Sequence, residues 1–240
     1  METVDAVAGY TTYIDLIHPL IKGKQIVSTT MKKEVDRVSA ALDLALSGTS
    51  CAVVSSGDSG VYAMAGLVLE MCHERSIAIG HDEKTADGKP LIIEVVPGIP
   101  ALCSGGALLG APLTHDFAAI SLSDLLTPWE VIENRLNAAA SADFVIVIYN
   151  PKSRRRADHL NRAQEIILRH RDPNTPVGVV TGAMRINQRV RLTTLQDLHR
   201  ADVDMQTTVF VGNLTTFIYQ GFMITPRGYA EKYNMKGSVK

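Results

Sequence analysis

One stretch, residues 51–71, constrains the fold of this chain more than any other. The apolar run Cys51–Val54 is typical of a buried strand, Ser55–Gly60 is a polar, glycine-containing turn, and Val61–Met71 has the apolar spacing of a helix. α/β proteins use this unit to present backbone N–H groups and one side chain to a small ligand. We expect Asp58, at the carboxyl end of the strand, to accept hydrogen bonds from a ribose or an amine. The alternative interpretation is an ordinary turn in which Asp58 caps the helix.

The first half of the chain repeats this alternation. Short strands are predicted at Gln25–Val27 and Leu91–Val96, with one helix capped by Thr30 and another over Ala101–Leu109. This order predicts a parallel sheet with crossover helices. Pro97-Gly98 forms a second strand-to-helix turn. Because parallel strands end at the same edge of a sheet, we expect it to line one crevice with the first turn. A plain connection is the alternative.

The second half has a different pattern. A strand is predicted at Phe117–Leu122, and Thr127-Pro128-Trp129-Glu130 is a strong helix start. Further elements follow: a central strand at Phe144–Tyr149, a helix at Ala157–His170, and short strands at Val177–Thr181, Arg189–Leu192, Thr207–Val211, Thr216–Tyr219 and Phe222–Thr225. We therefore predict two α/β domains, residues 1–113 with a parallel sheet and residues 114–240 with a mixed sheet.

Composition limits the classes of partner. The chain has 240 residues, of which 46% are hydrophobic and 20% charged, enough for a packed core. A formal net charge of −1 argues against a general nucleic-acid or membrane binder. The apolar runs are shorter than a membrane span, and residues after Met1 lack a signal-peptide pattern. Three cysteines without a CxxC pair are typical of a reduced, cytoplasmic protein.

A run of basic residues follows the predicted central strand: Lys152, Arg154, Arg155 and Arg156. Such a run is often a solvated face. Here it lies just past the carboxyl end of a buried strand, where α/β sheets bind ligands. Arginines at this position suit a substrate with several carboxylates, because guanidinium pairs carboxylate bidentately.

Several familiar chemistries are disfavoured. Gly57-Asp58-Ser59-Gly60 resembles a serine-protease site, but no partner motif for a triad histidine is present. There is no Walker loop, GxGxxG fingerprint or histidine spacing typical of a metal site, so we predict no protein-bound metal. His115-Asp116 lies between the predicted domains; a structural role is favoured over a catalytic one.

The chain resembles the tetrapyrrole methylase family over nearly its whole length, and within it the enzymes that methylate carbon 17 of precorrin-3B or cobalt-factor III. The segments that carry the resemblance are residues 6–13, 54–66, 95–101, 115–129, 142–145, 149–154, 211–213 and 224–229. The resemblance implies two α/β domains, S-adenosylmethionine bound in the cleft between them, and a homodimer.

By position, the resemblance also implies roles for individual residues. Those implied to contact the methyl donor are Ser56, Gly57, Asp58, Val61, Pro100, Ala101, Asn150, Ala183, Thr225 and Pro226. Lys152, Arg154 and Arg155 are implied to pair with carboxylates of a precorrin or cobalt-precorrin substrate.

The implied reaction transfers the sulfonium methyl group to carbon 17, with ring contraction, in cobalamin biosynthesis. Because the donor is already activated, binding and orientation supply most of the acceleration. A proton acceptor or donor would assist the contraction, and His115 and Asp116 are the candidates. The alternatives are a non-catalytic tetrapyrrole-binding protein and methylation at another ring position.

Three departures from the family pattern are expected to matter. The family opens with a strand and a Gly-Xaa-Gly-Pro-Gly turn, which is not found ahead of Ala6, so we expect the first sheet to lack that strand. Ser59 stands where the family often has proline, which should loosen the turn. Pro100 replaces a usual threonine or serine and removes a hydroxyl and a backbone donor.

Overall fold

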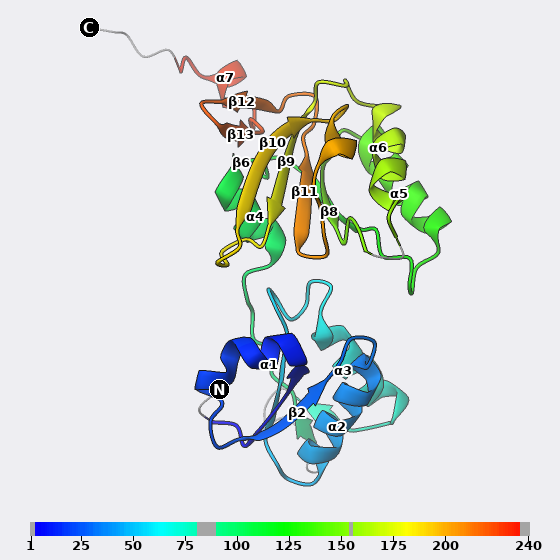
Figure 1. Ribbon diagram of the computed structural model, residues 1–240, viewed down its shortest axis with the longest axis vertical. Helices are drawn as coiled ribbons and strands as arrows, with labels where there is room; N and C mark the ends of the chain where they lie inside the picture. The colour runs from blue at the N-terminus through cyan, green and yellow to red at the C-terminus, as the bar shows by residue number, and fades with distance from the viewer. Residues whose placement is uncertain (1–2, 81–89, 154–155, 236–240) are drawn as a thin grey trace, which may run out of the picture. The chain divides into compact units, whose positions relative to one another are not determined.

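The computed structural model describes residues 3–80, 90–153 and 156–235, which form two compact units, Met1–Pro100 and Ala101–Lys240 (Figure 1). The first unit has a parallel sheet and the second a mixed sheet, as predicted. The predicted domain boundary lies between residues 113 and 114, whereas the boundary between the two compact units follows Pro100. Helix α4 (Ala101–Leu109) therefore belongs to the second unit, where its Leu109 packs with Val147 and Phe210.

The N-terminal unit is built around a three-stranded parallel sheet of order β2-β1-β3. Its elements are β1 (Ala6–Tyr10), α1 (Thr11–Ile17), a 3-10 turn (His18–Leu20), β2 (Gln25–Thr29), α2 (Glu34–Leu46), β3 (Cys51–Val54), α3 (Met64–Glu74), β4 (Ile79–Gly80) and β5 (Leu91–Ile92). The central strand is β1, in which Ala8 pairs with both Val27 and Val53.

Strand β1 was not predicted, because its sequence, AVAGY, is short and consists largely of small residues. Its packing explains how it forms. Residues Ala6–Ala8 are fully buried, and a Cβ added at Gly9 would lie 2.6 Å from Val54 Cγ2 and 2.9 Å from Ile14 Cδ1. Small side chains here let the strand lie close to its neighbours, which is a property of the tertiary structure rather than of local propensity.

Other boundaries in this unit also differ from the predictions. The segment Leu91–Val96 is not one buried strand: only Leu91–Ile92 pairs, with β4, and Val95 and Val96 are 49% and 64% exposed. Helix α2 begins at Glu34 without a side-chain cap, so the cap predicted at Thr30 is wrong. An apolar cavity lies between β3, helices α2 and α3, and residues 91–96. The expected absence of a family strand from this sheet stays a prediction.

The C-terminal unit contains a five-stranded mixed sheet of order β10-β9-β11-β8-β7 and a small sheet of order β12-β13-β6. After α4 its elements are β6 (Gly110–Ala111), β7 (Phe117–Ser121), α5 (Trp129–Ser141), β8 (Val145–Tyr149), α6 (His159–Leu168), β9 (Pro176–Thr181), β10 (Arg189–Thr194), a 3-10 turn (Leu198–Arg200), β11 (Thr207–Val211), β12 (Phe217–Tyr219), β13 (Phe222–Ile224) and α7 (Tyr229–Lys232). Helix α5 begins after Pro128 without a side-chain cap, so the predicted cap at Thr127 is wrong.

Alternate residues of β8 pack into two hydrophobic clusters, one on each face of the sheet. Ile146 and Ile148 pack against α5 and α6, whereas Val147 and Tyr149 pack against α4 on the opposite face (Figure 1). Both faces of the sheet are thereby covered, which explains the continuous apolar run in this strand. Among the described residues, no helix is long and apolar enough to cross a bilayer.

Strand direction decides which loops meet in this unit. β7 and β8 are parallel, and β8 and β9 are both antiparallel to β11. The strands β7, β8 and β9 therefore all end at one edge, which we call the strand-end edge; it carries Ser121, Tyr149 and Thr181. The opposite edge carries the start of β8 and the end of β11.

Candidate functional site

In the N-terminal unit, the Asp58 carboxylate joins the two predicted turns. Its Oδ1 accepts a hydrogen bond from the Gly60 N–H (2.8 Å), and its Oδ2 accepts one from the Gly98 N–H (2.9 Å). Ser59 Oγ donates to the Val96 carbonyl (2.9 Å). The N–H groups of Gly98 and Gly60 hold the pKa of Asp58 below its usual value, because they favour the charged form. The two turns therefore lie against each other, although the strands before them belong to different sheets.

Glycine is required where these turns touch. A Cβ on Gly98 would lie 2.0 Å from the Gly57 carbonyl oxygen and 3.2 Å from Asp58 Cα. Gly57 itself has a φ of +82°, in the left-handed region that favours glycine. The close backbone approach, with Gly57 and Gly60 exposed, makes a surface that suits a small polar ligand.

The structure contradicts one of the two sequence interpretations of Asp58, that of a helix cap, and the contact with a ligand stays a prediction. Asp58 does not cap α3, which begins at Met64 with Ala63 at its N-cap and no side-chain cap. Its oxygens accept hydrogen bonds from the backbone at Gly98, Gly60 and Val61, so its observed role is to clamp the two turns together. The structure brings Gly57 and Asp58 next to residues 98–100, and Ser56 directly precedes them in the chain.

In the C-terminal unit, three predicted site residues share the strand-end edge. Asn150, at a φ of +52°, follows β8, and its Nδ2 donates to Ser121 Oγ at the end of β7 (2.9 Å). The Tyr149 hydroxyl accepts a hydrogen bond from the Leu102 N–H in the first turn of α4 (2.8 Å). Ala183 follows β9 and packs against the same apolar cluster as Tyr149 and Leu102. The start of α4 at Ala101, Asn150 and Ala183 are thus held at one edge.

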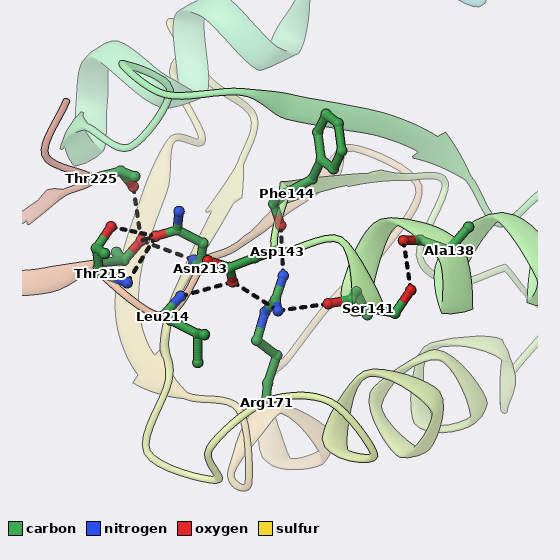
Figure 2. A network of polar contacts seen from close by, with 11 residues as sticks. Ala138, Ser141, Asp143, Phe144, Arg171, Asn213, Leu214, Thr215 and Thr225 are labelled. Atoms are coloured by element: carbon green, nitrogen blue, oxygen red, sulfur yellow. Dashed lines mark hydrogen bonds and ion pairs between the residues drawn. The ribbon is translucent and has the colours of Figure 1, made fainter. Parts of the chain in front are cut away.

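Thr225 and Pro226 lie at the opposite edge. Thr225 is completely buried: its hydroxyl shares a hydrogen bond with the Thr216 hydroxyl (2.8 Å), and its N–H donates to the Ala111 carbonyl (3.0 Å). The Thr216 hydroxyl in turn donates to Asn213 Oδ1 (3.0 Å), close to the start of β8 (Figure 2). The structure therefore does not bring these two residues together with Asn150 and Ala183. They follow strand β13, which lies at the opposite edge of the five-stranded sheet.

His115 and Asp116 also lie away from the strand-end edge, because they precede β7. The Asp116 N–H donates to His115 Nδ1 (2.8 Å), and the two side chains are 46% and 80% exposed. They line an open cleft together with Pro226, Arg227 and Glu231. This environment neither buries nor orients a proton-transfer group, so it favours the structural interpretation.

The basic run after β8 is only partly described. Lys152 is exposed, and Arg154 and Arg155 lie outside the described residues. Arg156 turns inward: its side chain is 12% exposed, its Nε donates to Ser153 Oγ (3.1 Å) and lies 3.9 Å from Asp124 Oδ1. In the described part of the chain, no group of three or more side chains is arranged to hold a metal ion.

Sequence reasoning missed one polar pair, Asp124 and His159. His159 Nε2 lies 3.0 Å from Asp124 Oδ2, and the histidine side chain is 13% exposed. Burial raises the pKa of Asp124, but the hydrogen bond and charge of His159 outweigh it and hold the pKa below its ordinary value. The one sequence signal for this pair was that Asp124 follows β7 and His159 follows β8, two strands that both finish at the strand-end edge. The two residues themselves are far apart in the sequence.

Comparison with known proteins gives consistent matches. The family model of tetrapyrrole (corrin/porphyrin) methylases matches residues 1–199. A protein named cobalt-factor III methyltransferase from Priestia megaterium is 49% identical over 96% of this chain, and the chain spans only 41% of that protein's length. A probable cobalt-factor III C(17)-methyltransferase from Salmonella typhimurium is 45% identical, over 95% of this chain and 90% of that protein.

Two solved structures share the fold. The crystal structure of the methyltransferase CobJ has a TM-score of 0.82 and 34% identity, covering 94% of this chain and 90% of that one. A uroporphyrin-III C-methyl transferase from Thermus thermophilus, solved with S-adenyl homocysteine, has a TM-score of 0.62 over 88% of this chain and 86% of its own, with 20% identity, and so attests the fold alone. From the family model and from relatives matched over nine-tenths of both chains, this chain belongs to the tetrapyrrole (corrin/porphyrin) methylase family.

Proposed function

We propose that this chain is an S-adenosylmethionine-dependent methyltransferase that methylates carbon 17 of precorrin-3B or cobalt-factor III, with ring contraction, in cobalamin biosynthesis. The observation that carries the proposal is the 45% identity over nine-tenths of both chains to the Salmonella protein named for this activity. The structural match to CobJ at 34% identity supports the same assignment.

The methyl donor is proposed to bind at the two clamped turns and at the strand-end edge. Its contacts in the first unit would be Ser56, Gly57, Asp58, Val61 and Pro100, and in the second unit Ala101, Asn150 and Ala183. The donor supplies an activated methyl group, so the protein's task is to hold that group in line with a ring carbon. Pro100 offers no backbone N–H, so hydrogen bonds at the second turn would come from its neighbours. We leave Thr225 and Pro226 out of this set, because they lie at the other edge.

The tetrapyrrole's carboxylates are proposed to pair with Lys152, Arg154 and Arg155. Exposed Lys152, directly after the central strand, supports this assignment. Several cationic side chains in one loop suit a substrate that carries several carboxylates.

The test is conversion of substrate by the purified protein. The protein is incubated with S-adenosylmethionine and either precorrin-3B or cobalt-factor III without oxygen, and the product is analysed by mass spectrometry and NMR. We expect one added methyl group, at carbon 17. Binding of tetrapyrrole without any methylated product would favour the non-catalytic alternative, and a methyl group elsewhere would favour a different ring position.

We expect Asp58→Ala to weaken S-adenosylmethionine binding by about tenfold or more, because two N–H groups lose a charged acceptor and the turns separate. Asp58→Asn, which keeps one acceptor oxygen, should lose less. The pKa of Asp58 lies below its ordinary value, so the clamp should persist at neutral pH and weaken only as the pH falls below about 4. Titration calorimetry from about pH 8 to about pH 3, on both sides of the ordinary carboxyl pKa, measures all three effects.

The matched control is Asp5→Ala. Asp5 makes a similar local bond, accepting from the Ser50 hydroxyl (2.7 Å), but it precedes β1 at the opposite end of the sheet. Its replacement should leave donor affinity unchanged. Equal losses in the two variants would show that Asp58 acts only through general stability.

We also propose that the protein is a cytoplasmic homodimer. All three cysteines are free thiols, which suits a reducing compartment. Large apolar side chains are exposed on β12 and β13, at Phe217, Ile218, Tyr219 and Phe222, and such patches commonly mark protein contacts. Sedimentation analysis of the purified chain tests the dimer.

A further inference from the structure

Asp124 and His159 lie beside residues already assigned to the strand-end edge. Asp124 is in the loop after β7, and His159 is the first residue of α6, in the segment that follows β8. Ser121 Oγ accepts hydrogen bonds from Asn150 Nδ2 (2.9 Å) and from the Ser123 N–H (3.2 Å). This hydroxyl therefore ties the loop that carries Asp124 to Asn150.

The hydrogen bond between the two side chains determines which imidazole nitrogen can take a proton. An ionised carboxylate only accepts hydrogen bonds, so His159 Nε2 must donate to Asp124 Oδ2 across their 3.0 Å separation. The lowered pKa of Asp124 supports the ionised form. In neutral imidazole the other nitrogen, Nδ1, then carries a lone pair. A carboxylate that orients a histidine in this way is a recurrent arrangement for general-base catalysis.

The groups around His159 hold the ring in place. Its imidazole makes an edge contact with the Trp129 ring of α5 at 4.7 Å between centroids. Trp129 Nε1 donates to Glu133 Oε2 (3.2 Å), and the Arg162 guanidinium of α6 lies 4.1 Å above the Trp129 ring. Arg156 faces the same carboxylate as His159. The charged groups that these contacts place around the pair are thus Glu133, Arg156 and Arg162.

The proposed reaction needs a proton acceptor. As the bond from the ring carbon to the methyl group forms, the S–CH3 bond breaks and the sulfonium becomes a neutral thioether. The ring carbon contributes the electron pair, so the positive charge passes to a pyrrole-type ring nitrogen. In the metal-free substrate, precorrin-3B, this nitrogen carries a proton, and loss of that N–H proton, with its electron pair remaining on nitrogen, restores a neutral ring. An oriented, mostly buried imidazole is suited to accept it.

We propose that His159, oriented by Asp124, is the proton acceptor when the methyl group is transferred to the metal-free substrate, precorrin-3B. The inference rests on the proposed function, and it replaces His115 and Asp116, which are exposed at the opposite edge of the sheet. It also assigns a role to the 121–129 loop, for which no donor contact is proposed.

The test compares variants that separate proton transfer from structure. His159→Gln keeps an N–H donor for Asp124 but has no basic nitrogen. We expect its kcat to fall by about 100-fold, with the KM for S-adenosylmethionine and the melting temperature unchanged. In His159→Ala, added imidazole should restore part of the rate.

The control is His170→Gln. His170 also makes a side-chain hydrogen bond, from Nε2 to Asn137 Oδ1 (2.8 Å), but on the exposed side of the helices. Its kcat should match that of the wild type. A wild-type kcat in His159→Gln, or no rescue of His159→Ala by imidazole, would overturn the proposal. Failure of the proposed function would appear differently, as absence of methylated product from the wild-type protein.

Discussion

Replacing Gly98 with alanine is expected to separate the two clamped turns of the N-terminal unit. The new Cβ would lie 2.0 Å from the Gly57 carbonyl oxygen, with the Gly57 carbonyl carbon at 3.0 Å and Asp58 Cα at 3.2 Å. All three atoms belong to the backbone, so no side chain can rotate away. The shift would also break the bond from the Gly98 N–H to Asp58. We expect the free energy of unfolding of this unit to fall by about 3 kcal/mol, and S-adenosylmethionine binding to be lost.

The chain provides a clean measurement of this effect. Its single tryptophan, Trp129, lies in the C-terminal unit, so its fluorescence reports on that unit and far-UV circular dichroism reports on both. In urea, Gly98→Ala should shift the dichroism transition and leave the fluorescence transition in place.

Gly66→Ala is the control for Gly98→Ala. Gly66 lies inside α3, and an added Cβ meets nothing within 4 Å. This variant should be more stable than the wild type by up to about 1 kcal/mol. If Gly98→Ala proved as stable as the wild type, the close approach of the two turns would be wrong.

Replacing Arg171 with methionine is expected to destabilise the C-terminal unit by about 3 kcal/mol, because removing one partner of a buried ion pair leaves the others unpaired. The Arg171 side chain is 1% exposed, and its Nη1 lies 2.8 Å from Asp143 Oδ1 and donates to the Ala140 carbonyl (2.6 Å). Its Nη2 donates to the Phe144 carbonyl (3.0 Å) (Figure 2). Burial lowers the pKa of Arg171 against the opposing effect of Asp143.

The same carboxylate extends the effect to a second loop. Asp143 Oδ1 also accepts a hydrogen bond from the Leu214 N–H (3.0 Å), next to Asn213 (Figure 2). Arg171 therefore joins the end of α5, the start of β8 and the loop after β11. Because Asp143 is about one-third exposed, water partly compensates it, and we expect a loss at the low end of the range for buried pairs.

Urea unfolding followed by Trp129 fluorescence measures the loss in Arg171→Met. Arg189→Ala is the control: Arg189 makes a similar contact with Asp202 (2.9 Å), but both side chains are largely exposed. Its replacement should change stability by less than about 1 kcal/mol. Similar losses in the two variants would contradict the role of burial.

The predicted elements of the second half were largely right, because their signals are local. β11 has the predicted bounds, and β8, β9 and β10 begin or end within a few residues of them. These strands are long apolar or alternating runs, which specify a strand by periodicity alone. Helix starts were less predictable: Thr30 and Thr127 have the chemistry of caps, but neither side chain caps a helix. Capping depends on the backbone angle at one residue, which the neighbouring packing sets.

In the candidate site, too, some features were expected from the sequence and others depend on how the elements pack. The adjacency of the turns at Asp58 and Gly98 was expected from the parallel order of strands, but β5 ends at Ile92 and pairs with β4 in a separate sheet, so the hydrogen bond from the Gly98 N–H to Asp58 joins the turns instead. The grouping of Thr225 and Pro226 with Asn150, implied by position in the family, did not hold in this structure, because β13 joins β6 at the other edge. No sequence pattern indicates at which end of a sheet a hairpin from the C-terminal part of the chain will pack.

The sequence by itself determined the α/β class and the parallel and mixed character of the two sheets, because periodicity and strand order are properties of the chain. Only the tertiary structure decided that Asp58 is a clamp, that Gly98 requires the absence of a Cβ, and that Asp124 meets His159. These contacts join residues distant in sequence, and their geometry exists only when separate strands and helices have packed together.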